Sequence, residues 1–364
     1  MSKRMKICIN TGGGDAPGLN AVIEAVTMAA YTRQWEVYGI KCGYTGLLNT
    51  DELITLTPEK VDGIASIGGT ILGTTNKGNP FMMPVCNAAG EWEQRDLSDR
   101  VMENFRRLRF DALIAVGGDG SLEIAHRFAE KGMPVIGVPK TIDNDMGGTV
   151  ITFGFDTAVS IATEAIDRLH STAKSHDRVM VVEVMGRNAG FIALNSGISG
   201  NADVILIPEI PFDIDKVCDK IMDNELHGHK YAIVVVAEGA LPKGGEVITK
   251  GTGEAGRQHV VLGGIAEYVA KEVSLRTGKD SRSMVLGHLL RGGSPTTFDR
   301  LLSLRFGAAA VRAIELGKFD HMVSLQSPDI ALVPLGEALG IQKRVRADGD
   351  TVLTGRDLGI CFGD

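Results

Sequence analysis

The stretch Val135-Ile136-Gly137-Val138-Pro139-Lys140-Thr141-Ile142-Asp143-Asn144-Asp145 decides the fold, because an apolar run leads directly into two carboxylates. Upstream, the apolar run Leu113–Val116 leads in the same way into Gly117-Gly118-Asp119-Gly120-Ser121. Both runs read as buried strands, and ligands of open α/β sheets bind outside the carboxyl ends of such strands. The sequence therefore predicts a site at this sheet edge, with phosphate-binding backbone, a candidate metal ligand and a candidate base.

Apolar runs alternate with helix-like stretches along most of the chain, which indicates βαβ units and a parallel sheet. A length of 364 residues favours two domains over one core. We expect domain seams near Gly147–Phe155 and Lys243–Gly256. The predicted strands are Met5–Ile9, Val37–Ile40, Leu113–Val116, Val135–Val138, Val179–Val184, Val204–Ile207 and Ala232–Ala237. The predicted helices are Leu19–Tyr31, Ser98–Leu108, Leu122–Lys131, Asp156–Thr172, Asp215–Asn224, Gly263–Thr277 and Phe298–Leu316.

Composition narrows the class of protein. The net charge of −7 disfavours nucleic acid as a general partner. No apolar run approaches the roughly 20 residues that a membrane helix needs, so we expect no membrane partner. The five cysteines are odd in number and contain no CxxC, which favours reduced thiols and a cytoplasmic location over a disulfide framework or a zinc site.

Two glycine-rich loops predict anion binding. Thr11-Gly12-Gly13-Gly14 follows the first strand and precedes a helix, where free backbone N–H groups and the helix dipole attract phosphate. A tight turn is the alternative, and neither a Walker A loop nor a dinucleotide fingerprint is present. In the second loop, Asp119 could ligate Mg²⁺, which prefers one or two carboxylates plus substrate phosphates. The alternative is an aspartate that caps the following helix.

The pair Asp143 and Asp145 could divide the work of a general base and of a group that orients it or assists the metal. Its alternative is an Asx turn that caps its own backbone. Four arginines in glycine-rich settings suit bidentate phosphate recognition, although any one of them could be a solvated surface charge. They are Arg178, Arg187, Arg282 and Arg291.

The order of these motifs resembles the phosphofructokinase family over nearly the whole chain. The matching blocks are GGDAPGLN, GGDGS, PKTIDND, SHDR, VVEVMGRNAG, AEG and LGHLLRGGSP. The resemblance implies two Rossmann-like three-layer α/β domains with mostly parallel sheets and an active site in the cleft between them. It also implies phosphoryl transfer from a nucleotide to the 1-hydroxyl of fructose 6-phosphate, with Mg²⁺ as cofactor.

The resemblance also implies roles for individual positions. Asp143 matches the catalytic base, Arg187 the residue that stabilises the transferring phosphoryl group, and Asp119 the Mg²⁺ ligand. Asp145, Lys140 and Gly120 complete the expected catalytic set. Expected donor contacts are Gly14, Tyr44, Lys77, Gly118, Asp119, Gly120 and Ser121. Expected sugar-phosphate contacts are Thr141, Ile142, Asp143, Met185, Gly186, Arg187, Glu238, His288 and Arg291. Arg178 and Arg282 match residues that reach the sugar phosphate from a neighbouring subunit, so we expect a homodimer or homotetramer.

The donor depends on two positions. Pyrophosphate-dependent members of the family have Asp where this chain has Gly120, and Lys at the position of Lys140. A carboxylate at position 120 would occupy the space of the α-phosphate and repel it, whereas glycine leaves room for a nucleotide. We therefore expect ATP, with Lys140 acting as a point charge on the transferring phosphoryl group. The nearest cation in the loop after Leu72-Gly73-Thr74 is Lys77, where many relatives have arginine.

Three other readings stay open from the sequence. One is a pyrophosphate-dependent enzyme, favoured by Lys140. Another is a catalytically silent sugar-phosphate-binding subunit, which would not need Asp119, Asp143 and Arg187 together. The third is another GGDG kinase acting on a lipid or on NAD, which would not need the TIDND and MGRNAG blocks. We assign residues 1–154 and about 266–317 to a donor-binding domain. Residues 155–265 and about 318–340 form the expected sugar-phosphate domain, followed by a tail at 341–364.

Overall fold

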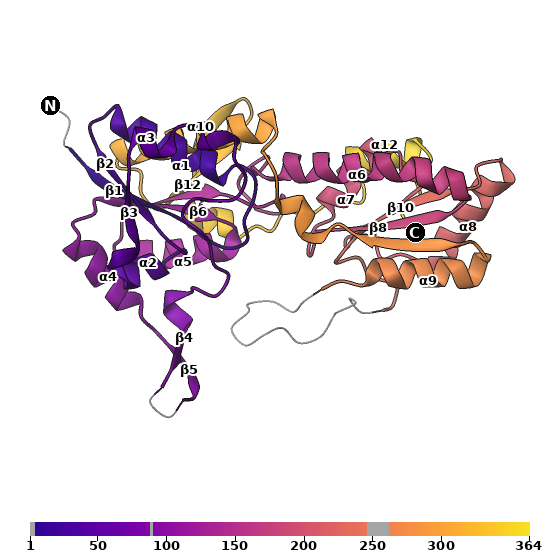
Figure 1. Cartoon of the computed structure of the whole chain (residues 1–364), viewed down its shortest axis with the longest axis horizontal. Helices are drawn as coiled ribbons and strands as arrows, with labels where there is room; N and C mark the ends of the chain where they lie inside the picture. Colours follow the sequence, from indigo (N-terminus) through magenta and orange to yellow (C-terminus); the bar gives the residue numbers. More distant parts are fainter. Residues whose placement is uncertain (1–3, 88–89, 246–261) are drawn as a thin grey trace.

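The computed structural model describes residues 4–87, 90–245 and 262–364, which form two α/β lobes (Figure 1). The first lobe is built on a seven-stranded sheet, whose inner pairs are parallel and whose two outermost pairs are antiparallel. Its strands, in spatial order, are β13 (Asp329–Pro334), β12 (His321–Gln326), β7 (Val135–Pro139), β6 (Ala112–Gly117), β1 (Lys6–Thr11), β2 (Glu36–Ile40) and β3 (Leu53–Leu56).

Helices cover both faces of this sheet because successive strand residues point to opposite sides. Ile7 and Ile9 of β1 face a core shared with α1 (Leu19–Tyr31) and α10 (Thr297–Glu315). Cys8 faces the opposite core, which holds α4 (Ser98–Arg107), α5 (Asp119–Glu130) and α11 (Leu335–Leu339). The lobe is completed by a hairpin and short helices, which are β4 (Met83–Cys86), β5 (Trp92–Arg95), α2 (Thr45–Leu48), α3 (Pro58–Val61), η1 (Thr50–Glu52), η2 (Ile64–Ser66) and η3 (Pro80–Met82).

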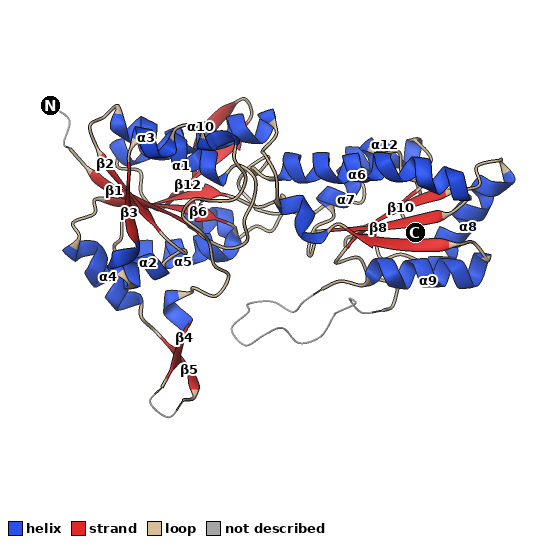
Figure 2. Ribbon diagram, viewed as in Figure 1, coloured by secondary structure: helices blue, strands red, loops and turns tan. Residues whose placement is uncertain are grey.

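The second lobe has a four-stranded, wholly parallel sheet with helices on both faces (Figure 2). Its strands, in spatial order, are β11 (Ser281–Val285), β8 (Val179–Val184), β10 (Ala232–Ala237) and β9 (Val204–Leu206). One face packs on α6 (Phe155–His176), α7 (Phe191–Ser199) and α12 (Asp350–Asp357), and the other on α8 (Ile214–Leu226) and α9 (Ile265–Thr277). Both sheets thus have three-layer packing, as predicted.

The seven predicted strands and seven predicted helices are confirmed, with shifts of a few residues at their ends. The expected division of the C-terminal third requires correction. Residues 266–285, expected in the first lobe, lie in α9 and β11 of the second, because β11 pairs in parallel with β8. Residues 318–340, expected in the second lobe, supply β12 and β13 to the first, where β12 pairs with β7.

The tail at 341–364 belongs to the second lobe, because Val345, Val352, Ile360 and Phe362 are buried in its core. The chain therefore passes from the first lobe to the second, back again, and finally to the second once more. The seam predicted near Gly147–Phe155 agrees with the first passage, which leads into α6. Most of the seam predicted at Lys243–Gly256 lies outside the described residues. Among the helices of the described ranges, none is long and apolar enough to cross a lipid bilayer.

Candidate active site

The two predicted phosphate loops and the acidic loop converge at the carboxyl ends of β1, β6 and β7. The Gly12 amide donates to the Val116 carbonyl at 2.9 Å, and the Lys140 amide donates to the Gly117 carbonyl at 2.9 Å. Glycine at position 12 allows close packing, because a Cβ atom there would lie 2.7 Å from the Ser121 hydroxyl and 3.1 Å from the Ser121 Cβ atom in the first turn of α5. This close packing brings Gly118 and Ser121 beside the first glycine loop, as the sequence predicts.

The acidic loop presents Asp143 with one unpaired oxygen. Its Oδ1 is buried and has no hydrogen-bond partner in the described residues. Burial first, and the charge of Asp145 second, raise the pKa of Asp143 to about 7. Thr141 orders the loop, since its hydroxyl accepts from the Asp143 amide at 3.1 Å and donates to Asp145 Oδ1 at 3.4 Å. A carboxyl group that titrates near neutral pH with a free oxygen is suited to act as a general base.

Asp119 lies in the first turn of α5, beside Gly120, at the mouth of the same loops. Burial, and then the charges of Asp145 and Glu123, raise its pKa to about 6. Lys140 is almost fully buried and donates from Nζ to the Gly14 carbonyl. Burial, and then repulsion by Arg291, lower the pKa of Lys140 to about 7. The ionisable groups of the site therefore affect one another's pKa values, and binding of an anionic ligand or a cation would change their protonation.

The second lobe faces these loops with the ends of β8 and β10. The Gly239 amide donates to the Gly186 carbonyl at 3.1 Å, and a Cβ atom on Gly239 would overlap the Arg187 carbonyl oxygen. Only glycine allows this approach, which brings Glu238 next to the Met185-Gly186-Arg187 loop. Burial raises the pKa of Glu238, and the charge of Arg187 opposes that rise.

Arg291 joins the two lobes directly. It ends the short helix η4 (Gly287–Arg291) of the second lobe, and its Nη1 donates to the Asp15 carbonyl of the first lobe at 2.9 Å. Its guanidinium thus lies against the Gly14 loop. The side chain of Ile142 also crosses the boundary, since it is fully buried in the core of the second lobe and can offer a ligand only its backbone. His288 lies exposed in η4, near Arg291 in the chain.

Arg178 and Arg282 lie at the other end of the second sheet. Arg178 precedes β8, and Arg282 follows Ser281, which pairs with Val179 at the start of that strand. Both arginines bind Asp280, through Nε at 2.5 Å and Nη1 at 2.5 Å respectively. The six residues of β8 span about 20 Å at 3.3 Å per residue, so these arginines are remote from Arg187 of the same chain.

Two predicted donor contacts have different surroundings. Lys77 is exposed in the loop beside the first glycine turn, where the Gly13 amide donates to the Thr75 carbonyl at 3.2 Å. Tyr44 instead lies in the core, 4% exposed, with its ring 5.1 Å from that of Phe128. Its aromatic ring therefore supports the sheet behind the loops and is not presented on the protein surface.

Sequence reasoning missed two residues that bind predicted site residues or their loop. Asp280 holds Arg178 and Arg282 together, and Lys343, in the C-terminal tail, binds the acidic loop. Neither residue belongs to a recognisable motif. The pairing of β11 with β8 would have been needed to find Asp280, and the path of the tail would have been needed to find Lys343.

The residues present fit a magnesium ion bound together with a phosphate ligand. The described residues contain no group of three or more His, Cys, Asp or Glu side chains that could hold a metal alone. Mg²⁺ needs only one or two carboxylates when substrate phosphates and water supply the rest. Asp119 and Asp145 meet that requirement, because the charge of Asp145 contributes to the raised pKa of Asp119 and a bound cation would relieve that repulsion.

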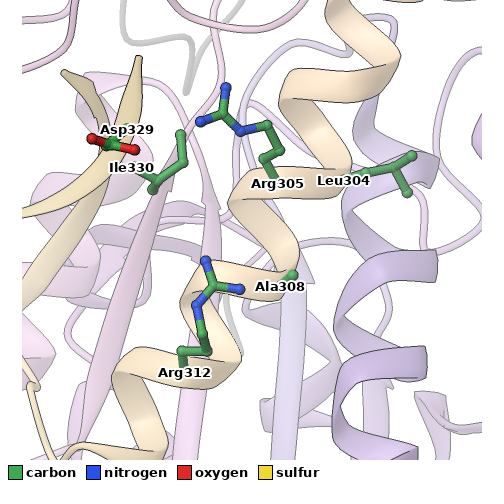
Figure 3. Close-up of a pocket in the computed structure, with 6 residues that line it drawn as sticks. All are labelled: Leu304, Arg305, Ala308, Arg312, Asp329 and Ile330. Atoms are coloured by element: carbon green, nitrogen blue, oxygen red, sulfur yellow. The ribbon is translucent and has the colours of Figure 1, made fainter. Parts of the chain in front are cut away.

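A separate pocket lies between α10 and β13 on the first lobe, and none of its lining residues is a predicted site residue (Figure 3). Arg305, Arg312 and Asp329 are its charged side chains. The convergence of the loops, and not this pocket, therefore defines the candidate site.

The comparisons with known proteins agree with this arrangement. A family model described as Phosphofructokinase matches residues 6–314. An ATP-dependent 6-phosphofructokinase of Chloroflexus aggregans is 51% identical over 363 residues, covering 100% of this chain and 99% of its own. A pyrophosphate–fructose 6-phosphate 1-phosphotransferase of Streptomyces coelicolor is 46% identical over 361 residues, covering 99% and 100%.

A solved structure gives the same fold. Pichia pastoris phosphofructokinase in the T-state superposes with a TM-score of 0.79 at 32% identity, over 98% of this chain and 37% of that one. Sequence relatives that match along the full length and a solved structure of the same fold thus lead to one assignment. The chain belongs to the phosphofructokinase family.

Proposed function

We propose that this protein is an ATP-dependent 6-phosphofructokinase, which transfers the γ-phosphoryl group of ATP to the 1-hydroxyl of fructose 6-phosphate. The products are fructose 1,6-bisphosphate and ADP. The observation that carries the proposal is the unpaired, buried oxygen of Asp143 at the point where the glycine loops meet the second lobe. Full-length relatives named ATP-dependent 6-phosphofructokinase support it.

In this mechanism Asp143 accepts the proton of the 1-hydroxyl as the new O–P bond forms. The bond between the γ-phosphorus and the bridging oxygen breaks, and ADP leaves with the bonding electron pair. Asp143 is suited to this role because its pKa of about 7 leaves much of it ionised at neutral pH while keeping it basic. Arg187 and Lys140 place positive charge where the transferring group develops negative charge, and such fixed charges supply most of the catalysis in phosphoryl transfer.

The sugar phosphate is held by the second lobe. Glu238 accepts sugar hydroxyls beside the loop of Arg187, and His288 and Arg291 bind the 6-phosphate. Arg178 and Arg282 serve the site of a neighbouring subunit, which is supported by their distance from Arg187 in the same chain. We therefore propose a homodimer or homotetramer with shared sites. We place the protein in the cytoplasm, and its five free cysteines fit a reducing compartment.

We assign Mg²⁺ to Asp119, assisted by Asp145 and the donor phosphates. When bound, the ion neutralises charge on the β- and γ-phosphates and orients them. The N–H groups around Gly14, Gly118 and Ser121 bind the same phosphates. Gly120, in the first turn of α5, selects ATP, because an aspartate there would occupy the space of the α-phosphate and repel it.

One observation favours pyrophosphate as a second candidate donor. Lys140 is buried against the Gly14 carbonyl, where pyrophosphate-dependent relatives also have lysine. The relative in Streptomyces coelicolor carries a pyrophosphate-dependent name at 46% identity.

The test is the formation of fructose 1,6-bisphosphate from fructose 6-phosphate and Mg²⁺, with ATP and pyrophosphate in separate reactions. Turnover with ATP and little with pyrophosphate supports the proposal. Turnover mainly with pyrophosphate would show that Lys140, and not Gly120, determines the choice of phosphoryl donor. No turnover with either donor would refute the kinase and favour a silent sugar-phosphate-binding subunit.

A further inference from the structure

The C-terminal tail crosses the acidic loop of the other lobe. Just after α11, the Lys343 amide donates to the Asp145 carbonyl at 2.7 Å, and Gln342 forms an antiparallel bridge with Met146. The contact is so close that a Cβ atom on Gly147 would overlap the carbonyl oxygen of Ile341. The tail is therefore packed against the loop along its backbone, and does not merely lie near it.

The ammonium group of Lys343 binds three oxygen atoms around the same loop. Its Nζ lies 2.9 Å from Asn144 Oδ1, 2.9 Å from the Val150 carbonyl and 3.4 Å from the Thr149 carbonyl. An ammonium has three donors, so all of its hydrogen-bonding capacity is used. None of these three acceptors is a carboxylate. Among the described residues, the half-buried ammonium group therefore has no direct ion pair.

Asn144 is the turn residue that separates the two catalytic carboxylates. It is 7% exposed and has a φ of 53°, in the left-handed region that asparagine tolerates better than most residues. Its Oδ1 accepts from the Thr152 amide at 3.2 Å as well as from Lys343. Fixing this side chain fixes the turn, and the turn determines where Asp143 and Asp145 point.

The other end of the same tail segment binds the loop that carries Arg187. The Val345 amide donates to Glu209 Oε1 at 2.8 Å, and the Gly190 amide donates to both Glu209 oxygens at 3.1 Å. Gly190 closes the loop that begins at Met185. One short segment therefore contacts both the loop of the base and, through Glu209, the loop of the phosphoryl-binding arginine.

We propose that Lys343 is a positioning residue for phosphoryl transfer, which holds the turn at Asn144 and thereby sets Asp143 against the loop of Arg187. This inference rests on the proposed function, because it assigns Lys343 a part in the same reaction.

The test compares K343M with R344M. Methionine keeps the length of lysine and removes the charge and the donors. Arg344 is the matched control, because it is the next residue, is exposed, and within the described residues its side chain makes one hydrogen bond, to Gln342 Oε1 at 3.4 Å. We expect K343M to lower kcat about tenfold or more, since small displacements of reacting groups cost up to about 100-fold. The KM values for both substrates and the melting temperature should stay close to those of R344M.

A second measurement does not depend on turnover. The Thr152 amide reports directly on Asn144, so its hydrogen exchange in the free protein should be faster in K343M than in wild type and R344M. Unchanged exchange, unchanged kcat, or a loss of kcat that only follows a loss of folded protein would overturn the proposal. If wild type phosphorylates no sugar phosphate, the proposed function fails, and Thr152 exchange still decides whether Lys343 orders the loop.

Discussion

Replacing Asp143 with asparagine should lower kcat at least about 100-fold and yet stabilise the fold near neutral pH. The native pKa of about 7 lies above the ordinary value of 3.8, chiefly because of burial. The native state therefore binds this proton more tightly than the unfolded state does. The stabilising effect of the bound proton is complete below pH 3.8 and is lost as the pH rises to about 7.

The size of this effect follows from the two pKa values. A tenfold change in proton affinity is worth about 1.4 kcal/mol, so the ionised carboxylate costs up to about 4 kcal/mol above pH 7. The substitution also removes the attraction between the Asp143 carboxylate and the cations Lys140 and Arg291. This loss offsets part of the gain in stability. We expect D143N to gain about 1 to 2 kcal/mol more relative to wild type at pH 8 than at pH 5.

Urea unfolding at both pH values measures this gain. The fluorescence of Trp35 reports on the first lobe, because its side chain is only 5% exposed there. D62N is the matched control, since Asp62 is an exposed carboxylate of the same lobe. Loss of a general base lowers kcat by about 100- to 10,000-fold. If D143N gained no more at pH 8 than D62N, or kept kcat within tenfold of wild type, the role assigned to Asp143 would be wrong.

Three other substitutions test separate parts of the site. G239A should raise the KM for fructose 6-phosphate at least tenfold and leave the KM for ATP unchanged, because its methyl group displaces the Arg187 loop. If steady-state assays gave G239A the same KM for fructose 6-phosphate as wild type, this prediction would be wrong. G120D should lower kcat/KM for ATP about 100-fold, since the repulsion of two unit charges about 5 Å apart costs about 3 kcal/mol at an effective dielectric constant of 20. Unchanged ATP kinetics would exclude Gly120 as the selector. R282A and D143N, each inactive alone, should recover part of the activity when their subunits are mixed and reassembled, and failure in verified mixed oligomers would argue against shared sites.

Much of the fold could be predicted because the buried strands are largely apolar runs. Ala232–Ala237 is wholly apolar and buried, and Val179–Val184 is buried and interrupted only by Glu183, so both are typical of strands of a parallel sheet. The edge strand β11, Ser281–Val285, is largely exposed and polar at its start, so its sequence has no such pattern. The apolar pattern also shows that a segment is buried without showing which sheet buries it, which is why the C-terminal third was divided incorrectly.

The parts of the candidate site that consist of local sequence motifs could be predicted. Asp119 and Asp143 each follow a recognisable strand, so their convergence follows from parallel pairing. Tyr44 shows the limit, because its sequence neighbourhood does not reveal that the ring packs in the core. Lys343 could not be predicted as a site residue, since its contacts are with residues nearly two hundred positions away in the sequence.

The repeated passage of the chain between the lobes has a consequence for biosynthesis. The central sheet of the first lobe is not complete until β12 and β13 have been made, well after the whole of α6 to β11. The core of the second lobe is likewise incomplete until Phe362, which is buried in it, has been synthesised. Neither lobe can therefore be finished during translation before the other has largely been synthesised, and no single cut of the gene would yield two fragments that each contain a complete lobe.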